Sequence, residues 1–235
     1  MGRAARVTAT GAAGSGADVR EIHRRLRRAH GPLDPPRKRD PIEELVLTIL
    51  SQNTSDVNRD RAFEALRARF PTWEGVADAP TEELREAIRP GGLAKTKAPR
   101  IQHVLREIRA REGRLDLSWM GDAPDEEIEE YLLGLPGVGR KTAACVLAFA
   151  LERPALPVDT HVYRVAGRLG LLPPRANPDR AHQALRDLVP ARLRVPLHVA
   201  LIRHGRRICK AGVPRCGECP LADLCPSAEL FLGSS

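Results

Sequence analysis

A lysine at the start of a predicted helix is the residue in this sequence best suited to chemistry. It stands in the segment Leu-Pro-Gly-Val-Gly-Arg-Lys-Thr-Ala, residues 135–143, where a glycine-rich turn leads into an apolar stretch. The chain holds 38 basic residues, yet only five of them are lysines. Arginine keeps its proton in proteins whereas lysine can lose it, so a neutral Lys141 amine could attack a sugar carbon and form a Schiff base. Chance placement of one lysine in five is the alternative.

The turn before Lys141 is suited to binding an anion. Glycines permit backbone angles that side chains forbid, and they let another backbone approach closely. The backbone N–H groups of Gly137, Gly139 and Arg140 lie at the start of a helix, where a phosphate is favoured. A helix–hairpin–helix pattern of this kind predicts binding to the DNA backbone without reading the base sequence. A tight turn between two helices is the structural alternative.

A carboxylate that could assist Lys141 lies in the segment Pro-Val-Asp-Thr-His, residues 157–161. Asp159 is predicted to cap the next helix, which would fix the direction of its side chain. A fixed anion could also stabilise the positive charge that develops on a sugar as its base departs. Capping alone is the simpler interpretation. We expect His161 to serve the structure or contact a phosphate rather than carry a proton.

Four cysteines near the end of the chain form a candidate metal site. They follow the spacing C-x6-C-x2-C-x5-C and are Cys209, Cys216, Cys219 and Cys225. Four thiols in a short segment are typical of metal binding in an intracellular protein, and either zinc or an iron–sulfur cluster fits the spacing. Lys210 and Arg215 lie between the first two cysteines, where a rigid loop could present them to phosphates.

Composition limits the class of protein. Aromatic residues make up 3% of the chain, and β-branched residues do not alternate, so helices are favoured over sheets. The net charge of +8 predicts a polyanionic partner, nucleic acid first, although solubility alone could explain it. There is no apolar run of ~18 residues, so we expect no membrane span. Residues 1–17 are small and polar and are predicted to form a flexible arm.

Helical spacing recurs along most of the remaining sequence. Proline, glycine and capping residues divide it into about ten predicted helices, and no segment reads as a convincing strand. Helices are expected, for example, from Asp18 to about Ala29, from Asp125 to Leu133 and from Arg140 to about Leu151. The predicted fold class is therefore all-α.

The order of these motifs over roughly residues 20–225 resembles the endonuclease III family of DNA glycosylases. The resemblance rests on the hairpin with its lysine, the Val-Asp-Thr-His segment and the His-Gly-Arg-x-x-Cys segment that opens the cysteine tail. It implies that Lys141 is the nucleophile, that Asp159 is its essential partner and that the four cysteines hold a [4Fe–4S] cluster.

The resemblance also implies two helical domains with the active cleft between them. Residues 35–153 would form a six-helix barrel with the helix–hairpin–helix, and residues 18–34 and 154–235 would form the iron–sulfur domain. One loop, with Gln52 or Asn53, would fill the gap left by an extruded base. Another would place Leu93 as a wedge against the opposite strand.

The resulting hypothesis is a bifunctional DNA glycosylase/AP lyase that removes oxidised pyrimidines and cuts 3′ of the abasic site by β-elimination. The expected partner is double-stranded DNA that carries a damaged base or an abasic site. We expect a monomer that does not bind membranes, in the cytoplasm with the nucleoid, as in bacteria. The alternatives are a mismatch-specific or adenine-specific monofunctional glycosylase and a non-catalytic iron–sulfur DNA-binding protein.

Overall fold

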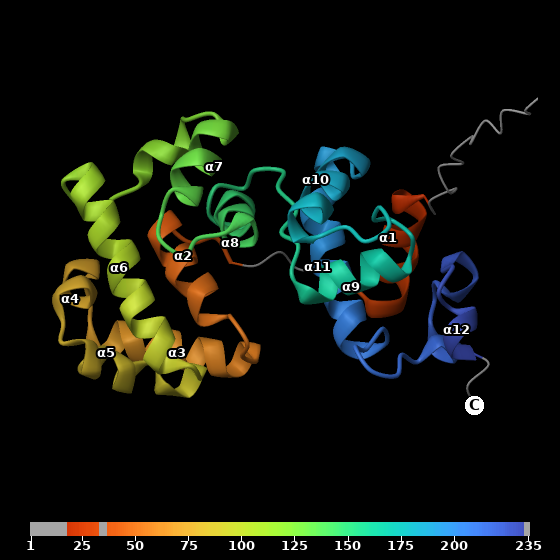
Figure 1. The fold of residues 1–235 in the computed structure, drawn as a ribbon, viewed down its shortest axis with the longest axis horizontal. Coiled ribbons are helices and arrows are strands. Elements are labelled where there is room, and N and C mark those ends of the chain that lie inside the picture. Colours follow the sequence, from red (N-terminus) through yellow and green to blue (C-terminus); the bar gives the residue numbers. More distant parts are fainter. Residues whose placement is uncertain (1–17, 33–36, 233–235) are drawn as a thin grey trace, which may run out of the picture.

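The computed structural model describes residues 18–32 and 37–232, and the predicted arm at residues 1–17 lies outside them. Every regular element in the described ranges is a helix, which confirms the all-α prediction. The helices form two lobes that lie side by side (Figure 1).

The first lobe is built from consecutive elements of the chain. They are α2 (Pro41–Leu50), α3 (Asp56–Arg69), α4 (Trp73–Asp78), α5 (Thr81–Ala87), η1 (Arg89–Gly91), α6 (Ala94–Glu112), η2 (Ser118–Gly121), α7 (Asp125–Leu133), α8 (Arg140–Cys145) and the π-helical turn η3 (Val146–Ala150). The second lobe combines the two ends of the described chain. It holds α1 (Val19–His30), α9 (Thr160–Arg168), α10 (Pro178–Leu188), α11 (Ala191–Arg207), η4 (Cys216–Glu218), η5 (Ala222–Leu224) and α12 (Glu229–Leu232).

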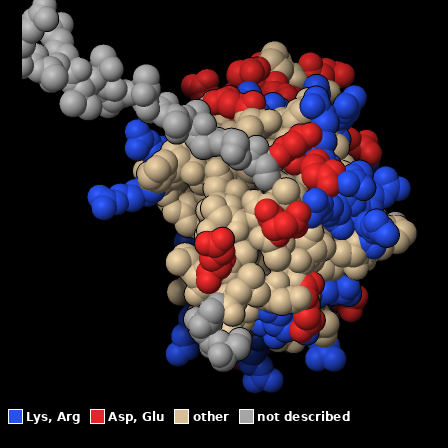
Figure 2. All heavy atoms as spheres, turned by 90° about the vertical axis from the view of Figure 1, so that its right-hand side faces the viewer, with Lys and Arg blue, Asp and Glu red and all other residues tan. Residues whose placement is uncertain are grey.

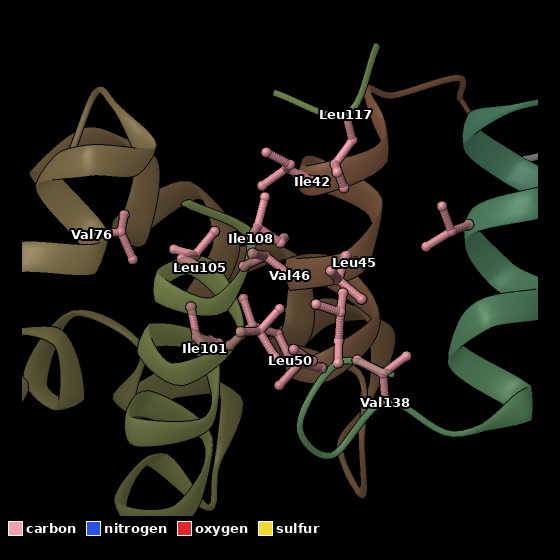
Figure 3. Packing of buried hydrophobic residues seen from close by; sticks show 14 of the residues in the cluster. Ile42, Leu45, Val46, Leu50, Val76, Ile101, Leu105, Ile108, Leu117 and Val138 are labelled. Carbon is pink, nitrogen blue, oxygen red and sulfur yellow. The ribbon is translucent and has the colours of Figure 1, made fainter. Parts of the chain in front are cut away.

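The core of the first lobe surrounds α2, which is apolar on almost every side. Leu45, Val46 and Leu50 of α2 pack against Ile101 and other aliphatic residues of α6 (Figure 3). Helix α2 therefore cannot move without disturbing most of the lobe, because protein interiors are close-packed. This rigidity fixes the loop that follows α2.

The core of the second lobe joins segments that are far apart in the sequence. Ile22 and Leu26 of α1 are fully buried against Leu197 and Leu201 of α11 and against Val162 of α9. The N-terminal helix thus completes a core that is otherwise formed by the C-terminal part of the chain.

Side-chain caps start several of the helices where the sequence predicts them. The side chain of Asp18 accepts a hydrogen bond from the Arg20 amide, and that of Ser55 accepts one from Asn58. Each cap satisfies one of the amides that a helix leaves open at its first turn.

Two helices differ from their predicted bounds. The stretch after Arg140 is not one regular α-helix, because α8 changes to a π-helical turn at Val146. Helix α11, which the sequence predicts from about Val195 to Ile208, begins at Ala191 and includes Pro196 in its second turn. Pro196 removes only one hydrogen bond there, and the Arg194 guanidinium holds this end by donating to the carbonyls of Arg186 and Val189.

The positive charge is not gathered on the end of the second lobe formed by α1 and α12. Figure 2 shows acidic and basic side chains intermingled on this face. Arg25, for example, is paired with both Glu21 and Asp223. A DNA-binding surface must therefore be sought elsewhere.

Candidate functional site

A cavity of about 870 Å³ lies where the two lobes meet. The first lobe contributes one face of α2, the loop after it and the start of α3 and α8, and the second contributes residues 158–161 and a face of α11. Lys141 and Asp159 both line this cavity, although they belong to different lobes. Five lysines or arginines and three acidic residues line it, so its walls favour a polyanion.

Lys141 stands on the first turn of α8 and is half-buried. The neighbouring Arg140 is exposed, and its guanidinium is paired with Glu129 at 3.2 Å and with Asp179 at 3.3 Å. The side chain of Arg140 is thus held by carboxylates, whereas Lys141 lines the cavity. The two adjacent cations therefore have different surroundings, and only Lys141 lines this cavity.

The hairpin before Lys141 presents exposed backbone amides. Gly137 has a φ of 73°, a conformation that favours glycine, and Gly139 occupies the N-cap position of α8. Within the described residues, neither glycine amide has a hydrogen-bond acceptor. A Cβ atom on Gly137 would lie 3.0 Å from the Nε atom of Arg100. The hairpin therefore offers open donors beside a further cation.

Asp159 is held in a fixed direction. Its Oδ1 accepts a hydrogen bond from the Val162 amide at 2.7 Å and caps α9, as the sequence predicts. The segment before it is tied down by His198, whose Nδ1–H donates to the Pro157 carbonyl at 2.7 Å. Burial lowers the pKa of His198 to about 4, so this ring is neutral. His198 was not found from the sequence, because it belongs to none of the motifs.

His161 lies at the cavity wall, but its ring is held in place by a hydrogen bond within the protein. Its Nδ1 atom is 3.0 Å from Nη2 of Arg164, which can only donate, so the histidine nitrogen accepts. Arg164 also donates to the carbonyls of Gly205 and Cys209. Burial lowers the pKa of His161, which is consistent with a neutral ring.

Gln52 and Asn53, the two candidates for filling the gap left by an extruded base, have different surroundings in the loop after α2. The Gln52 Oε1 accepts a hydrogen bond from Arg100 at 2.8 Å, so this side chain is held. Asn53 is exposed, has a φ of 52° and makes no hydrogen bond within the described residues. Both line the cavity, but only Asn53 has its amide group available.

Leu93 stands out from the surface of the first lobe. It has a φ of 50° and is 54% exposed, which is unusual for a leucine. Its loop is tied to the loop after α2 by the buried Lys97, whose Nζ donates to the carbonyls of Leu50 at 2.7 Å and Gly91 at 2.8 Å. The sequence did not identify Lys97, although its rarity as a lysine was a usable signal.

An ion pair crosses the mouth of the cleft. Arg206 of α11 makes two hydrogen bonds to the carboxylate of Asp56, the first residue of α3. The pair lowers the pKa of Asp56. Both residues line the cavity, so this contact links the lobes beside the site.

The four cysteines of the C-terminal segment converge on a second, much smaller cavity beside α9 and α11. Arg168 donates to the Cys209 sulfur at 3.3 Å, and His204 lies 3.5 Å from the sulfur of Cys219. Within the part of the chain that the structure describes, no three His, Cys, Asp or Glu residues are grouped so that they could hold one metal ion. The four thiols thus share one cavity.

The two cations of the cysteine loop are both exposed. Lys210 has its amine at the surface, and its carbonyl accepts a hydrogen bond from Arg168 at 2.7 Å. Arg215 is paired with Glu218 at 3.2 Å and donates to the Arg207 carbonyl. Lys210 is therefore the better placed of the two to meet a phosphate.

Comparison with known proteins agrees with this fold and site. Residues 46–191 match the family described as the HhH-GPD superfamily of base excision DNA repair proteins. Endonuclease III of Thermotoga maritima is 39% identical over 207 residues, which span 88% of this chain and 90% of that protein. A putative DNA glycosylase of Arabidopsis thaliana is 38% identical over 190 residues, which span 77% of this chain and 64% of the relative.

Solved structures give the same result. A trapped covalent intermediate of endonuclease III with DNA superposes with a TM-score of 0.77 at 30% identity, covering 91% of this chain and 97% of that one. Fold, cleft and matches define a DNA glycosylase of base excision repair. Within that class, the chain belongs to the endonuclease III family of the HhH-GPD superfamily. Among the described helices, none is both long and apolar enough to span a membrane.

Proposed function

We propose that this protein is a bifunctional DNA glycosylase/AP lyase for oxidised pyrimidines in duplex DNA. The observation that carries the proposal is the meeting of Lys141 and Asp159 in one cavity between the lobes. A nucleophile and a fixed carboxylate are the two groups that base removal through a Schiff base requires.

The reaction follows from these positions. The Nζ of Lys141 forms a bond to C1′ of the sugar, and the electrons of the base–sugar bond leave with the base. The Asp159 carboxylate stabilises the positive charge that develops on the sugar. The ring opens to a Schiff base, and β-elimination breaks the bond to the 3′ phosphate. Trapping with borohydride would reduce the Schiff base to a stable adduct.

The damaged nucleotide must leave the duplex to reach this cavity, at a cost of a few kcal/mol that is smallest for damaged pairs. We assign the gap left behind to Asn53, because Gln52 is held by Arg100. Leu93 is the wedge against the opposite strand, supported by its exposure.

We propose that phosphates of the duplex bind to donors on both lobes. The amides of the hairpin glycines supply backbone donors, and the exposed side chain of Lys210 adds charge. Arg140 contributes through its amide, since its guanidinium is paired with acids. His161 is held by Arg164 and Arg215 is paired with Glu218, so we propose that neither side chain contacts a phosphate directly.

We further propose that the two lobes are the two domains, residues 35–153 and residues 18–34 with 154–235. Their separate cores support this division. The four thiols around one cavity and the relation to endonuclease III support a [4Fe–4S] cluster held by Cys209, Cys216, Cys219 and Cys225. When bound, the cluster supplies iron–thiolate bonds that tie the cysteine loop to α11.

Covalent trapping tests the proposed function. Duplexes with thymine glycol, dihydrouracil or an abasic site are incubated with the protein and borohydride. The wild type is expected to form a protein–DNA adduct, and Lys141→Gln to form none. Lys38→Gln is the matched control, because Lys38 is an exposed lysine paired with Glu152 outside the cavity. Adduct formation by Lys141→Gln would contradict the assignment.

The Asp159→Asn variant distinguishes the role of the Asp159 charge in base release from its role as a helix cap. Asparagine caps a helix as well as aspartate does, so the variant is expected to keep its stability. It is expected to lose base release by at least about a hundredfold, because one preorganised charge contributes that much. Unchanged base release would show that Asp159 only caps α9.

The alternatives give different products on the same duplexes. A monofunctional mismatch or adenine glycosylase would release a base without cutting the strand or forming an adduct. A non-catalytic DNA-binding protein would bind the duplexes and leave them intact.

A further inference from the structure

One buried carboxyl group at the floor of the catalytic cavity has no place in the mechanism above. Glu44 of α2 is 4% exposed and is the only acidic residue buried among the described residues. Its Oε1 accepts a hydrogen bond from Thr48 at 3.2 Å. Its Oε2 has no hydrogen-bond partner, and the nearest cation is Arg39 at 3.8 Å. Burying a carboxyl group without full compensation costs stability, so this position calls for a functional explanation.

Glu44 and Lys141 line the same cavity, together with the side chains of Thr48 and Cys145. One face of α2 lines the cavity through Glu44 and Thr48, which are one helical turn apart. Cys145 lines it from α8, one turn after Lys141. Burial raises the pKa of the Cys145 thiol, and the charge of Lys141 acts in the opposite direction. Glu44, Thr48, Cys145 and Lys141 thus line one cavity, and the Thr48 hydroxyl group is bonded to the carboxyl group.

Groups on several elements around Glu44 affect the pKa of its carboxyl group. Burial raises the pKa of Glu44 to about 7. Thr48 on the same helix, Arg39 in front of α2, Lys141 on α8 and Arg59 on α3 all act in the opposite direction. Near neutral pH, both the acid and the carboxylate are therefore populated, which is the condition for exchanging a proton during turnover.

We propose that Glu44 acts through Lys141, as the group that receives the proton which the amine releases on bonding to the sugar. The inference rests on the proposed function. When Nζ bonds to C1′ and the base leaves with the electrons of its bond, the nitrogen becomes a cation and must lose one proton. That proton passes by way of the Thr48 hydroxyl group, which is hydrogen-bonded to Glu44, to the carboxylate, which becomes neutral. Glu44 is thus a positioning residue for the proton, and it does not touch the substrate.

The test is the pH profile of single-turnover trapping on a duplex with a preformed abasic site, from pH 5.5 to 9. The wild-type rate is expected to rise as Glu44 becomes a carboxylate near pH 7. Glu44→Gln is expected to lose that rise and to trap at least about tenfold more slowly at pH 8. Glu44→Asp should restore part of the rate, and Thr48→Val should slow trapping because it removes the intervening hydroxyl group.

Glu43→Gln is the matched control, because Glu43 lies beside Glu44 on α2 but outside the cavity. It is expected to retain the wild-type rate and profile. Thermal unfolding shows whether each variant folds. If Glu44→Gln does not fold, the pH profile of Thr48→Val is the test of the proposal. A wild-type profile in Glu44→Gln or, in that case, in Thr48→Val would overturn the role of Glu44 while leaving Lys141 as the nucleophile. Absence of trapping by the wild type would instead overturn the proposed function.

Discussion

The lobe that carries Lys141 and the lobe that carries Asp159 are built on different cores. The first has a continuous aliphatic core around α2, with the carboxyl group of Glu44 as its buried acid. The second has a smaller core that ends at Cys209, Cys219 and Cys225. The first half of the cleft therefore depends on hydrophobic packing, and the second depends also on what the thiols bind.

Because of this difference between the cores, we expect the largest loss of stability from replacing a cysteine of the second lobe. Cys219→Ser is expected to lower the iron content and the brown colour of the purified protein. It is also expected to lower the free energy of unfolding by roughly 4 kcal/mol or more, because loss of a structural metal centre is among the most damaging changes. Iron analysis, visible absorbance and denaturant unfolding measure these changes.

Leu105→Ala in the first lobe is the comparison for that variant. Leu105 is fully buried, and its truncation is expected to cost about 2–5 kcal/mol with no change in iron per folded protein. The two lobes would not differ as described if Cys219→Ser retained full iron and stability, or if Leu105→Ala lost iron in proportion.

Glu44 makes the stability of the first lobe depend on pH. Its pKa is raised from 4.5 to about 7, so between these values the folded protein binds more protons than the unfolded chain. Stability therefore falls as pH rises through this window, by roughly 2–4 kcal/mol for this group. Glu44→Leu removes this pH-dependent loss of stability. The free energy of unfolding of the variant relative to the wild type is therefore expected to increase from pH 5 to pH 8.

Urea unfolding of both proteins at the two pH values measures that difference directly. Taking the difference cancels the effects of the half-buried His182 and of the buried His198 and His204, whose lowered pKa values act on both proteins alike. A difference that stays constant with pH would show that Glu44 is charged in the folded protein throughout this range.

Loss of the Asp56–Arg206 ion pair between the lobes is expected to have the smallest effect. Arg206→Gln removes the ion pair with Asp56, and both side chains are partly exposed. Exposed pairs contribute about 0–1 kcal/mol and weaken with salt. Thermal unfolding in low and high salt should show a small loss that disappears at high salt. A loss of several kcal/mol would mean that the lobes depend on each other for folding.

The sequence predicts the class of fold and the start of most helices, because capping residues and prolines act locally. Asp18, Ser55 and Asp159 cap their helices through bonds to amides two or three residues away. The motifs also single out two residues, Lys141 and Asp159, that the structure brings to one cavity, and their catalytic role stays a prediction.

Other features depend on neighbours that the sequence does not place. Glu44 lies within an apolar helix, and only the packing of α8 against α2 brings it close to Lys141. The choice between Gln52 and Asn53 depends on Arg100, which is remote in sequence. The π-helical turn after Cys145 has no local sequence signal.

Locating the covalent bond to DNA tests the role of Lys141 most directly. The borohydride-reduced adduct with an abasic duplex is digested with nuclease and protease, and its peptides are sequenced by mass spectrometry. The sugar remnant is expected on the Nζ of Lys141 and on no other residue. A remnant on Lys38, Lys95, Lys97, Lys210 or the N-terminal amine would contradict the assignment.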